Sequence, residues 1–317
     1  MAKYDKKLTL VLPAYNEEQT IASVIIDFHK EIPGLIFCVV DNNSSDRTSE
    51  VVLETYEKLG IAAGNSILLH EKRQGKANAM KKAFYNLKSD VFLLVDADNT
   101  YPASAVHDLL KPVLNDEADI VIGDRHSAGG YGKENKRPLH GFGNNLVKHL
   151  INFLFGSNLK DILSGYRIMT SEFVKNFPII SKGFEIETEM TLFSLDKGYR
   201  VLELPVNYID RPDGSVSKLN TYTDGFKVLK SLAWIFKDYR PLLFFGFLSI
   251  VFILIGIIIG VPPVIEYLKF KYVYKVPSAI LAMGFVLLGV LLSMVGLILD
   301  TVVSIEKRNF EKTKIKH

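Results

Sequence analysis

The chain has 317 residues, and its 38 Lys and Arg against 35 Asp and Glu give a formal net charge of only +3. So small a charge argues against nucleic-acid binding, which normally requires a strongly basic face. The single cysteine excludes an intrachain disulfide and a cysteine-rich zinc site, and such sparse use of cysteine is typical of a reducing compartment.

Residues before about 240 alternate between short apolar runs and stretches with helical spacing. The alternation predicts right-handed strand–helix–strand units, and therefore an α/β domain with a mostly parallel sheet covered on both faces. Ser45 or Asp46 is expected to cap the second helix. The expected strands are 8–13, 36–41, 65–70, 91–98 and 119–123, and the expected helices are 17–32, 45–60, 75–87 and 102–114.

The last third of the chain is predicted to associate with a membrane. The stretches 241–265 and 276–300 contain no charged residue apart from Asp300 at the end of the second, and each is long enough for the roughly 20 apolar helical residues that cross a bilayer. We expect two transmembrane helices, the first of them ended or kinked by Pro262 and Pro263. The stretch 221–240 has amphipathic spacing, and we expect it either to lie in the membrane interface or to pack on the soluble domain.

Two spans would place both chain ends on one side of the membrane. The N-terminus shows no export signal of charged residues followed by apolar ones, so we expect domain 1–220 to be cytoplasmic. The basic tail, 301–317, agrees with the positive-inside rule, whereas lysines in the 266–275 connection weaken that argument.

Polar side chains follow three of the expected strands, at 13–17, 41–46 and 96–99. The carboxyl ends of parallel strands meet at one edge of a sheet, where ligands bind. No GxGxxG motif of dinucleotide-binding folds follows the first strand, and the chain has no GxxxxGK[ST] motif of P-loop enzymes. The sequence therefore predicts a ligand site of another kind at this edge.

Asp96 and Asp98 stand two residues apart after the fourth expected strand. Residues i and i+2 of an extended segment lie on one side, so these carboxylates would repel each other unless a cation lies between them. Oxygen ligands suit a hard divalent ion such as Mg²⁺ or Mn²⁺, which commonly bridges to phosphate oxygens. The pair therefore predicts a divalent-metal site.

Seven motifs in the first 220 residues resemble, in order, those of the GT-A type glycosyltransferases of the dolichol-phosphate mannose synthase and bacterial polyprenyl-phosphate glucosyltransferase family. The motifs are LPAYNEE, VVDNNSSDRT, QGKANAM, VDADNTYP, IGDR, DILSGYR and RPDGSVSK. The resemblance implies a GT-A (Rossmann-like) fold and inverting, metal-dependent transfer of a hexose from a nucleotide sugar to a polyprenyl phosphate, for cell-envelope or glycan assembly. The two spans match the bacterial branch, which favours UDP-glucose or a related UDP-hexose over GDP-mannose, undecaprenyl over dolichyl phosphate, and the bacterial plasma membrane.

The resemblance assigns the donor contacts first. Pro13 and Tyr15 would contact the nucleotide base, Glu17 the ribose, and Asp41 would accept a hydrogen bond from the base. Lys76 would approach the diphosphate beside the positive backbone dipoles of a helix start, although its charge pattern fits a solvated lysine equally well.

Asp96 and Asp98 would hold the donor and the Mg²⁺ or Mn²⁺ ion. Thr100 stands where the mannose synthases have a metal-binding Gln, so water would replace that ligand. Asn42 and Asn43 stand where the family often has Asp followed by Gly, and no role is carried over to them.

Arg125 and Arg137 would bind the acceptor phosphate through paired hydrogen bonds. Asp161 matches the residue usually assigned as the base. A phosphate monoester has a second pKa near 6 and is largely dianionic at pH 7, so little proton removal is needed. Asp161 would act either as the base or as a group that orients the acceptor and balances the arginines, with Arg167 as an expected partner.

Arg211, Ser217 and Lys218 lie in a segment that the resemblance expects to close over the diphosphate. Glu185 and Glu189 stand four apart on an expected helix and form a rival carboxylate pair, for which a solvated helix face is the favoured interpretation.

Two alternatives and one question of assembly remain. A processive polysaccharide synthase would normally carry a QxxRW segment and more spans, whereas Trp234 here lies in AWIF. A non-catalytic membrane scaffold would not need the intact acidic pair. Two spans beside an interfacial helix are compatible with a homo-oligomer.

Overall fold

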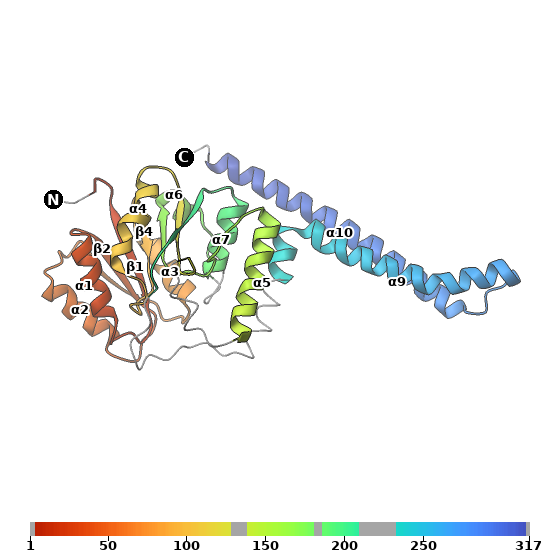
Figure 1. Cartoon of the computed structure of the whole chain (residues 1–317), viewed down its shortest axis with the longest axis horizontal. Coiled ribbons are helices and arrows are strands. Elements are labelled where there is room, and N and C mark those ends of the chain that lie inside the picture. Colours follow the sequence, from red (N-terminus) through yellow and green to blue (C-terminus); the bar gives the residue numbers. More distant parts are fainter. Residues whose placement is uncertain (1–3, 128–137, 181–185, 209–232, 315–317) are drawn as a thin grey trace. The chain divides into compact units, whose positions relative to one another are not determined.

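The computed structural model describes residues 4–127, 138–180, 186–208 and 233–314, with side chains of the helix that begins at Pro138 described from residue 145 onward. The chain divides into two compact units, residues 1–220 and 221–317. The first unit holds the sheet and its helices, and the second holds two long helices (Figure 1).

The first unit is built on a seven-stranded sheet with the order β3-β2-β1-β4-β6-β5-β7. Among the described strands, β6 alone runs antiparallel, and it does so against both of its neighbours, β4 and β5. This arrangement confirms the expected α/β fold with a mostly parallel sheet. The strands are β1 (Leu8–Ala14), β2 (Ile36–Asp41), β3 (Ser66–His70), β4 (Val91–Leu94), β5 (Ile120–Asp124), β6 (Arg167–Thr170) and β7 (Val201–Pro205).

The central strands form the core because helices cover both faces of the sheet. Every residue of β2 and of β4 is buried, as expected for apolar runs in a parallel sheet. The covering helices bury apolar residues at helical spacing, as α1 does with Ile21, Val24, Ile25 and Phe28. The helices of this unit are α1 (Ile21–Glu31), α2 (Thr48–Lys58), α3 (Lys76–Asn86), α4 (Val106–Leu114), α5 (Pro138–Phe155), α6 (Ser171–Asn176) and α7 (Ile186–Asp196), with the short 3₁₀ helix η1 at Ala103–Ala105.

Two helices begin later than the sequence indicates because the preceding residues form tight loops. The backbone N–H groups of Thr20 and Ile21 both donate to the carbonyl of Glu17, which makes a turn before α1. Before α2, the carboxylate of Asp46 accepts a hydrogen bond from the Thr48 N–H at 3.1 Å. The N-cap residue of α2 is Arg47, so neither expected residue holds that position. Asp46 nevertheless contacts the first turn from one residue earlier, whereas the Ser45 N–H donates to Asn16.

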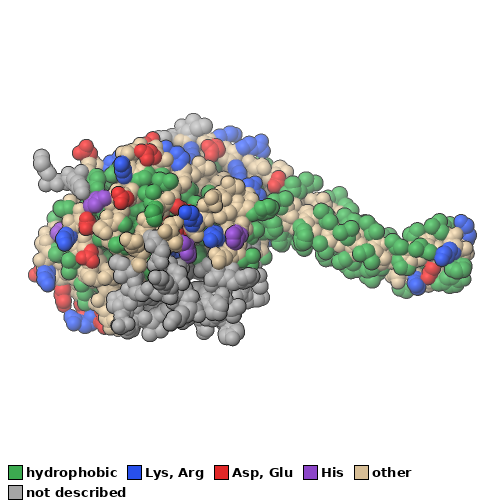
Figure 2. Space-filling view, in the orientation of Figure 1, with side chains coloured by type: hydrophobic (Ala, Val, Ile, Leu, Met, Phe, Trp, Pro, Cys, Tyr) green, Lys and Arg blue, Asp and Glu red, His purple; other side chains and the backbone are tan. Residues whose placement is uncertain are grey.

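The second unit contains α9 (Pro241–Phe270) and α10 (Val276–Lys314). Both are long and apolar enough to cross a membrane, and only 11% and 17% of their most apolar windows are buried. A core helix of a soluble protein would be largely buried, so these values argue against that role. Hydrophobic side chains line both helices in Figure 2, and charged ones gather near the turn between them.

The two prolines do not end α9, so of the two expected effects, an end or a kink, the first is wrong. The helix passes through Pro262 and Pro263 and ends at Phe270, where Lys271 takes a left-handed conformation with φ of 57°. A proline removes one N–H donor and crowds one carbonyl, and this local cost is tolerated in long apolar helices that have a packing partner. Likewise, α10 continues through the expected basic tail as far as Lys314.

Close packing of α9 against α10 depends on glycines. A Cβ on Gly256 would lie 2.9 Å from the Ala282 carbonyl oxygen, and one on Gly289 would lie 2.6 Å from Ile253 Cγ1.

Upstream, residues 221–232 of the expected amphipathic helix lie outside the described residues, while 233–239 are helical with Trp234 exposed.

Candidate active site

The loops after β1 and β2 are tied to each other at the carboxyl edge of the sheet. The Asn16 N–H donates to Ser44 Oγ at 3.0 Å, and Asn16 Oδ1 accepts from the Ser45 N–H at 2.8 Å. Asn43 has a φ of 64°, a conformation that favours glycine and that asparagine tolerates. Asn43 can therefore stand where the resembling family often has glycine.

Asp41 is the centre of the second loop. Its carboxylate accepts hydrogen bonds from the Ser44 N–H at 2.9 Å and from the Ser49 hydroxyl. Burial alone would raise the pKa of Asp41, but these hydrogen bonds outweigh burial and hold the pKa below its usual value. Asp41 is therefore ionised at neutral pH, in a form that accepts hydrogen bonds.

The other expected nucleotide contacts lie at the same edge. Pro13, Tyr15 and Glu17 are half-buried. The Glu17 carboxylate accepts from the Thr20 hydroxyl at 2.9 Å, and that hydroxyl also lies 2.8 Å from the Ala97 carbonyl oxygen. These contacts link the β1 loop to the Asp96–Asp98 segment after β4.

Asn42 anchors the loop that leads into α3. Its side-chain amide donates to the carbonyls of Glu71 and Arg73, and its Oδ1 accepts from the Gly75 N–H at 2.7 Å. An aspartate could accept from Gly75 but could not donate to the two carbonyls. The departure from the family pattern at this position thus has a structural role, which is to place the start of α3.

Lys76, the first residue of α3, does not point into solvent. Its ammonium group forms ion pairs with the carboxylates of Asp96 and of Glu187 on α7. The Lys76 side chain is 8% exposed and that of Glu187 is 6% exposed, so the solvated-lysine interpretation is wrong. Burial would lower the pKa of Lys76, but the two carboxylates outweigh it and raise the pKa.

Glu187 was not among the predicted site residues, and the predicted solvent exposure of Glu189 is wrong. Glu189 is buried, and its carboxylate accepts from the Ile180 N–H at 3.0 Å, so it does not lie on a solvated helix face. Glu185 lies outside the described residues. Three glutamates at alternate positions of the sequence, in EIETEM, are a signal that could have drawn attention to Glu187.

Asp96 and Asp98 are held in different ways. Asp98 is buried and accepts from the Thr100 hydroxyl at 2.6 Å, so Thr100 orients Asp98. Asp96 lies against Gly165, where an added Cβ would come within 2.8 Å of Asp96 Cγ. Only glycine leaves room for the Asp96 carboxylate at this point.

The two carboxylates supply oxygen donors of the kind that Mg²⁺ and Mn²⁺ prefer. The described residues contain no group of three or more His, Cys, Asp or Glu side chains placed to hold a metal. The donor set fits a divalent ion whose remaining ligands are water and diphosphate oxygens.

Arg125 and Asp161 form a bidentate ion pair beside this site. Arg125 Nε lies 2.7 Å from Asp161 Oδ2, and Arg125 Nη2 lies 2.8 Å from Oδ1. Burial would raise the pKa of Asp161, but hydrogen bonds and charge from Arg125 outweigh it and hold the pKa below its usual value. The Arg125 guanidinium also lies over the ring of Tyr208.

Arg167 is not the partner of Asp161. It is fully buried and donates to the carbonyls of Ser164 and Ile162 and to the Thr191 hydroxyl. Burial lowers the pKa of Arg167 to about 10, which leaves it charged at neutral pH. Arg167 therefore fixes the backbone between Asp161 and Gly165.

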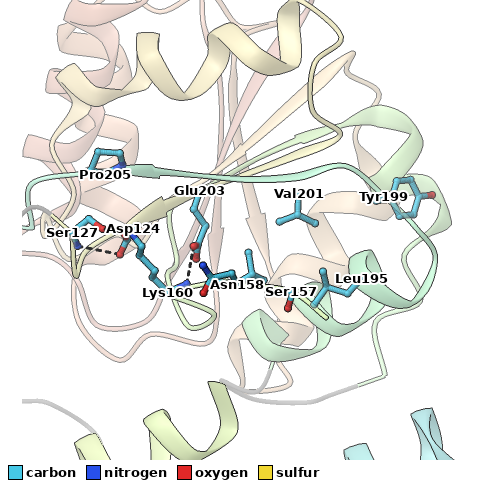
Figure 3. A pocket seen from close by; sticks show the side chains of 11 residues that line it. Asp124, Ser127, Ser157, Asn158, Lys160, Leu195, Tyr199, Val201, Glu203 and Pro205 are labelled. Carbon is cyan, nitrogen blue, oxygen red and sulfur yellow. Dashed lines mark hydrogen bonds between the residues drawn. The ribbon is translucent and has the colours of Figure 1, made fainter. Parts of the chain in front are cut away.

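Glu203 on β7, a second residue that the sequence analysis missed, holds the start of the same loop. Its two carboxylate oxygens accept from the backbone N–H groups of Lys160 and Asp161, at 2.7 Å and 2.8 Å. It also lines an open cavity of about 640 Å³ with Asp124, Ser127 and Lys160 (Figure 3). None of the sequence-predicted site residues lines this cavity, although Asp124 and Lys160 directly precede Arg125 and Asp161.

The remaining predicted contacts cannot be placed. Arg137, Arg211, Ser217 and Lys218 lie outside the described residues. In the described part of the chain, the site therefore consists of the loops after β1, β2, β4 and β5, the start of α3, and the segment between Asp161 and Gly165, joined by the side chains above.

Comparison with known proteins gives the family. Residues 9–177 match the family described as "Glycosyl transferase family 2". The chain is 30% identical over 308 residues to glycosyltransferase AglJ of Haloferax volcanii, and the match covers 96% of each chain. It is 28% identical over 233 residues to dolichyl-phosphate hexose transferase of the same organism, and that match covers 74% of this chain and 95% of the relative. The fold is similar to glucosyl-3-phosphoglycerate synthase of Mycobacterium tuberculosis in complex with Mn²⁺, UDP and glucosyl-3-phosphoglycerate, with a TM-score of 0.56, 20% identity and coverage of 72% and 80% of the two chains. The chain therefore belongs to glycosyltransferase family 2 and is a glycosyltransferase with a GT-A fold.

Proposed function

We propose that this glycosyltransferase transfers a hexose from a nucleotide sugar to the phosphate of a polyprenyl phosphate, with inversion. The observation that carries the proposal is the loop between Asp161 and Gly165. At one end Asp161 holds Arg125, and at the other Gly165 lies against Asp96. One short loop thus joins a guanidinium suited to an acceptor phosphate to a carboxylate suited to the donor. The relative named as a dolichyl-phosphate hexose transferase supports this acceptor class.

Asp161 serves in this proposal to orient Arg125 and to balance its charge. Both of its oxygens accept hydrogen bonds from Arg125, and its lowered pKa makes it a poor proton acceptor. A phosphate monoester is largely dianionic at pH 7 and needs no strong base to act as a nucleophile.

Charge repulsion is the main barrier that the site must reduce. A phosphate nucleophile approaches a diphosphate leaving group, and two unit charges 4 Å apart repel by about 4 kcal/mol at an effective dielectric of 20. Arg125 offsets part of this repulsion, and Arg137 and Lys218 are proposed to do the same from the segments outside the described residues. Attack in line at the anomeric carbon then inverts its configuration.

We propose that Asp98 and Asp96 hold Mg²⁺ or Mn²⁺ together with the donor diphosphate. Such an ion, when bound, neutralises charge on the departing nucleotide. Pro13, Tyr15, Glu17 and Asp41 are proposed to bind the nucleoside, and Arg211 and Ser217 to close over the diphosphate. The structural relative bound to Mn²⁺ and UDP is consistent with a metal-dependent UDP-sugar donor, and GDP-mannose is the second choice.

We propose that 241–265 and 276–300 cross the membrane, that 221–240 lies in the interface, and that domain 1–220 faces the cytoplasm. The low burial of α9 and α10 supports the spans. The two curated relatives named above both come from Haloferax volcanii, and one is named for a dolichyl phosphate. The prediction of undecaprenyl phosphate in a bacterial plasma membrane therefore stays a prediction, as does a homo-oligomer.

Label transfer tests the proposal. The full chain is incubated with polyprenyl phosphate, Mn²⁺ and, in turn, radiolabelled UDP-glucose, other UDP-hexoses and GDP-mannose, and label in the organic extract is counted. We expect one donor to label the lipid, and we expect Asp98→Ala or a chelator to abolish the label while the protein stays folded. Absence of label with every donor would contradict the proposal, and a growing sugar chain would favour the processive alternative.

A further inference from the structure

Lys76 connects three elements that are far apart in the sequence. It opens α3, and its ammonium group pairs with Asp96 after β4 and with Glu187 in the first turn of α7. The two carboxylates share one ammonium group, so Glu187 and Asp96 are linked through Lys76. The donor site proposed above includes Asp96 as a metal contact but gives Lys76 and Glu187 no role.

The three charges are unequally exposed. The side chains of Lys76 and Glu187 are 8% and 6% exposed, whereas that of Asp96 is 29% exposed. A buried charge must be paired, and here one ammonium group faces two carboxylates. The group of three side chains, Lys76, Asp96 and Glu187, carries one net negative charge, and Asp96 is its most exposed member.

Asp96 is confined from two directions. Lys76 binds its Oδ1, and the backbone of Gly165 lies so close that a Cβ there would come within 2.8 Å of Asp96 Cγ. Asp98 accepts a hydrogen bond from Thr100 in its own loop. The orientation of Asp96 depends on α7 through Lys76.

We propose that Glu187 is a positioning residue of the donor site, which acts through Lys76 to orient Asp96 and to leave the three side chains with a net negative charge toward a divalent cation. This inference rests on the proposed metal–nucleotide donor. With Glu187 present, Lys76 divides its charge between two carboxylates. With Glu187 neutral, Lys76 neutralises Asp96 alone, and the group has no net charge with which to attract the cation.

The charge arithmetic distinguishes this role from a purely structural one. Glu187→Gln removes one negative charge and leaves the group neutral. The double variant Lys76→Met with Glu187→Gln replaces the buried pair by side chains of similar size and restores one net negative charge, on Asp96. A positioning role through charge predicts that the second change partly reverses the first, whereas a structural role predicts that it adds further damage.

Binding of Mn²⁺ and nucleoside diphosphate to the detergent-solubilised full chain provides the test. Titrations use Mn²⁺ with UDP, and with GDP in parallel, followed by electron paramagnetic resonance and calorimetry, with thermal unfolding as the check of folding. We expect Glu187→Gln to weaken Mn²⁺ binding about tenfold and the double variant to bind Mn²⁺ within about threefold of wild type. Metal-free UDP should bind Glu187→Gln at least as tightly as wild type, because one negative charge is gone.

Glu189→Gln is the matched control, because it removes a buried carboxylate from the same helix whose Oε1 accepts from the Ile180 N–H. We expect it to bind Mn²⁺ as wild type does. Unchanged Mn²⁺ binding in Glu187→Gln would overturn the positioning role, as would a double variant that binds no more tightly than the single one. If Glu187→Gln does not fold, the double variant decides alone: binding within threefold of wild type supports the proposal, and binding tenfold weaker overturns it.

The assay needs no lipid, so its result is separate from that of the transfer reaction. A wild-type chain that binds Mn²⁺ with UDP but glycosylates no lipid would contradict the proposed acceptor and leave the role of Glu187 standing. A wild-type chain that binds neither nucleotide with Mn²⁺ would overturn both proposals.

Discussion

The Asp161 carboxylate forms a bidentate ion pair with Nε and Nη2 of Arg125, and the Asp161 side chain is 1% exposed. Removing one partner of a buried ion pair leaves the other charge without compensation. We expect Asp161→Asn to lower the free energy of unfolding at pH 7 by about 3 kcal/mol. Chemical unfolding of the solubilised chain measures this loss, and Asp116→Asn, at an exposed partner of Arg200, should change the free energy by less than about 0.5 kcal/mol.

The pH dependence of the same variant follows from the lowered pKa of Asp161. A carboxyl whose pKa is lower in the folded state than in the unfolded state stabilises the fold fully above its unfolded pKa of about 3.9, and this stabilisation is lost as the pH falls through the folded value. The difference between wild type and Asp161→Asn should therefore shrink below about pH 4. A difference that stayed constant down to pH 2 would contradict the ionised pair.

Gly165 allows the Asp96 carboxylate to approach the backbone. We expect Gly165→Ala to displace Asp96 and to reduce hexose transfer at least about 100-fold with the fold retained, because a misplaced reacting group costs about that much. Gly64→Ala is the control, since a Cβ at Gly64 meets no atom within 4 Å. Transfer assays and thermal unfolding check both variants, and full activity of Gly165→Ala would show that the approach is unimportant.

For single residues, the sequence predicted which side chains belong to the site, but it did not predict which side chains they contact. Asp96 could be named because it follows an apolar strand, and Lys76, Arg125 and Asp161 because their motifs resemble those of a known family. Their partners could not: the contact between Lys76 and Glu187 joins two helices more than 100 residues apart, and no spacing rule encodes it.

Among the elements, the strongest sequence signals were continuous apolar runs. The first five strands and the four helices between them lie where their patterns predicted, with ends moved by loop hydrogen bonds. The sequence pattern did not predict β6 and β7. The first has only four residues and begins with Arg167, and the second is a partly exposed edge strand whose Glu203 faces the Asp161 loop. Neither has the apolar run that marks a central parallel strand.

The helix pair α9–α10 allows a direct test of its packing. We expect Gly289→Ala to destabilise the pair by about 1–3 kcal/mol, because its Cβ would lie 2.6 Å from Ile253 Cγ1 and 2.9 Å from the Ser249 carbonyl oxygen. Gly284→Ala lies on the same helix and meets nothing within 4 Å, so it should have no such effect. Thermal unfolding in detergent compares the two, and equal midpoints would contradict the close packing.

For the whole molecule, the proposed topology places the catalytic domain and the C-terminal end of α10 on one side of the membrane. The single cysteine, Cys38, is buried, so it gives little background in labelling experiments. In sealed vesicles with the cytoplasmic face outward, we expect a membrane-impermeant thiol reagent to label Lys312→Cys readily and Tyr272→Cys only after permeabilisation. Labelling of both before permeabilisation would contradict two spans.

The most direct test of the whole account compares acceptors of one chain length: polyprenyl phosphate, polyprenyl diphosphate and the free polyprenol, each with the preferred nucleotide sugar and Mn²⁺. Mass spectrometry of the lipid extract identifies the product. We expect a single product, polyprenyl phosphate carrying one hexose, and no product from the free alcohol. Equal glycosylation of the free alcohol, or no glycolipid from the monophosphate, would contradict it.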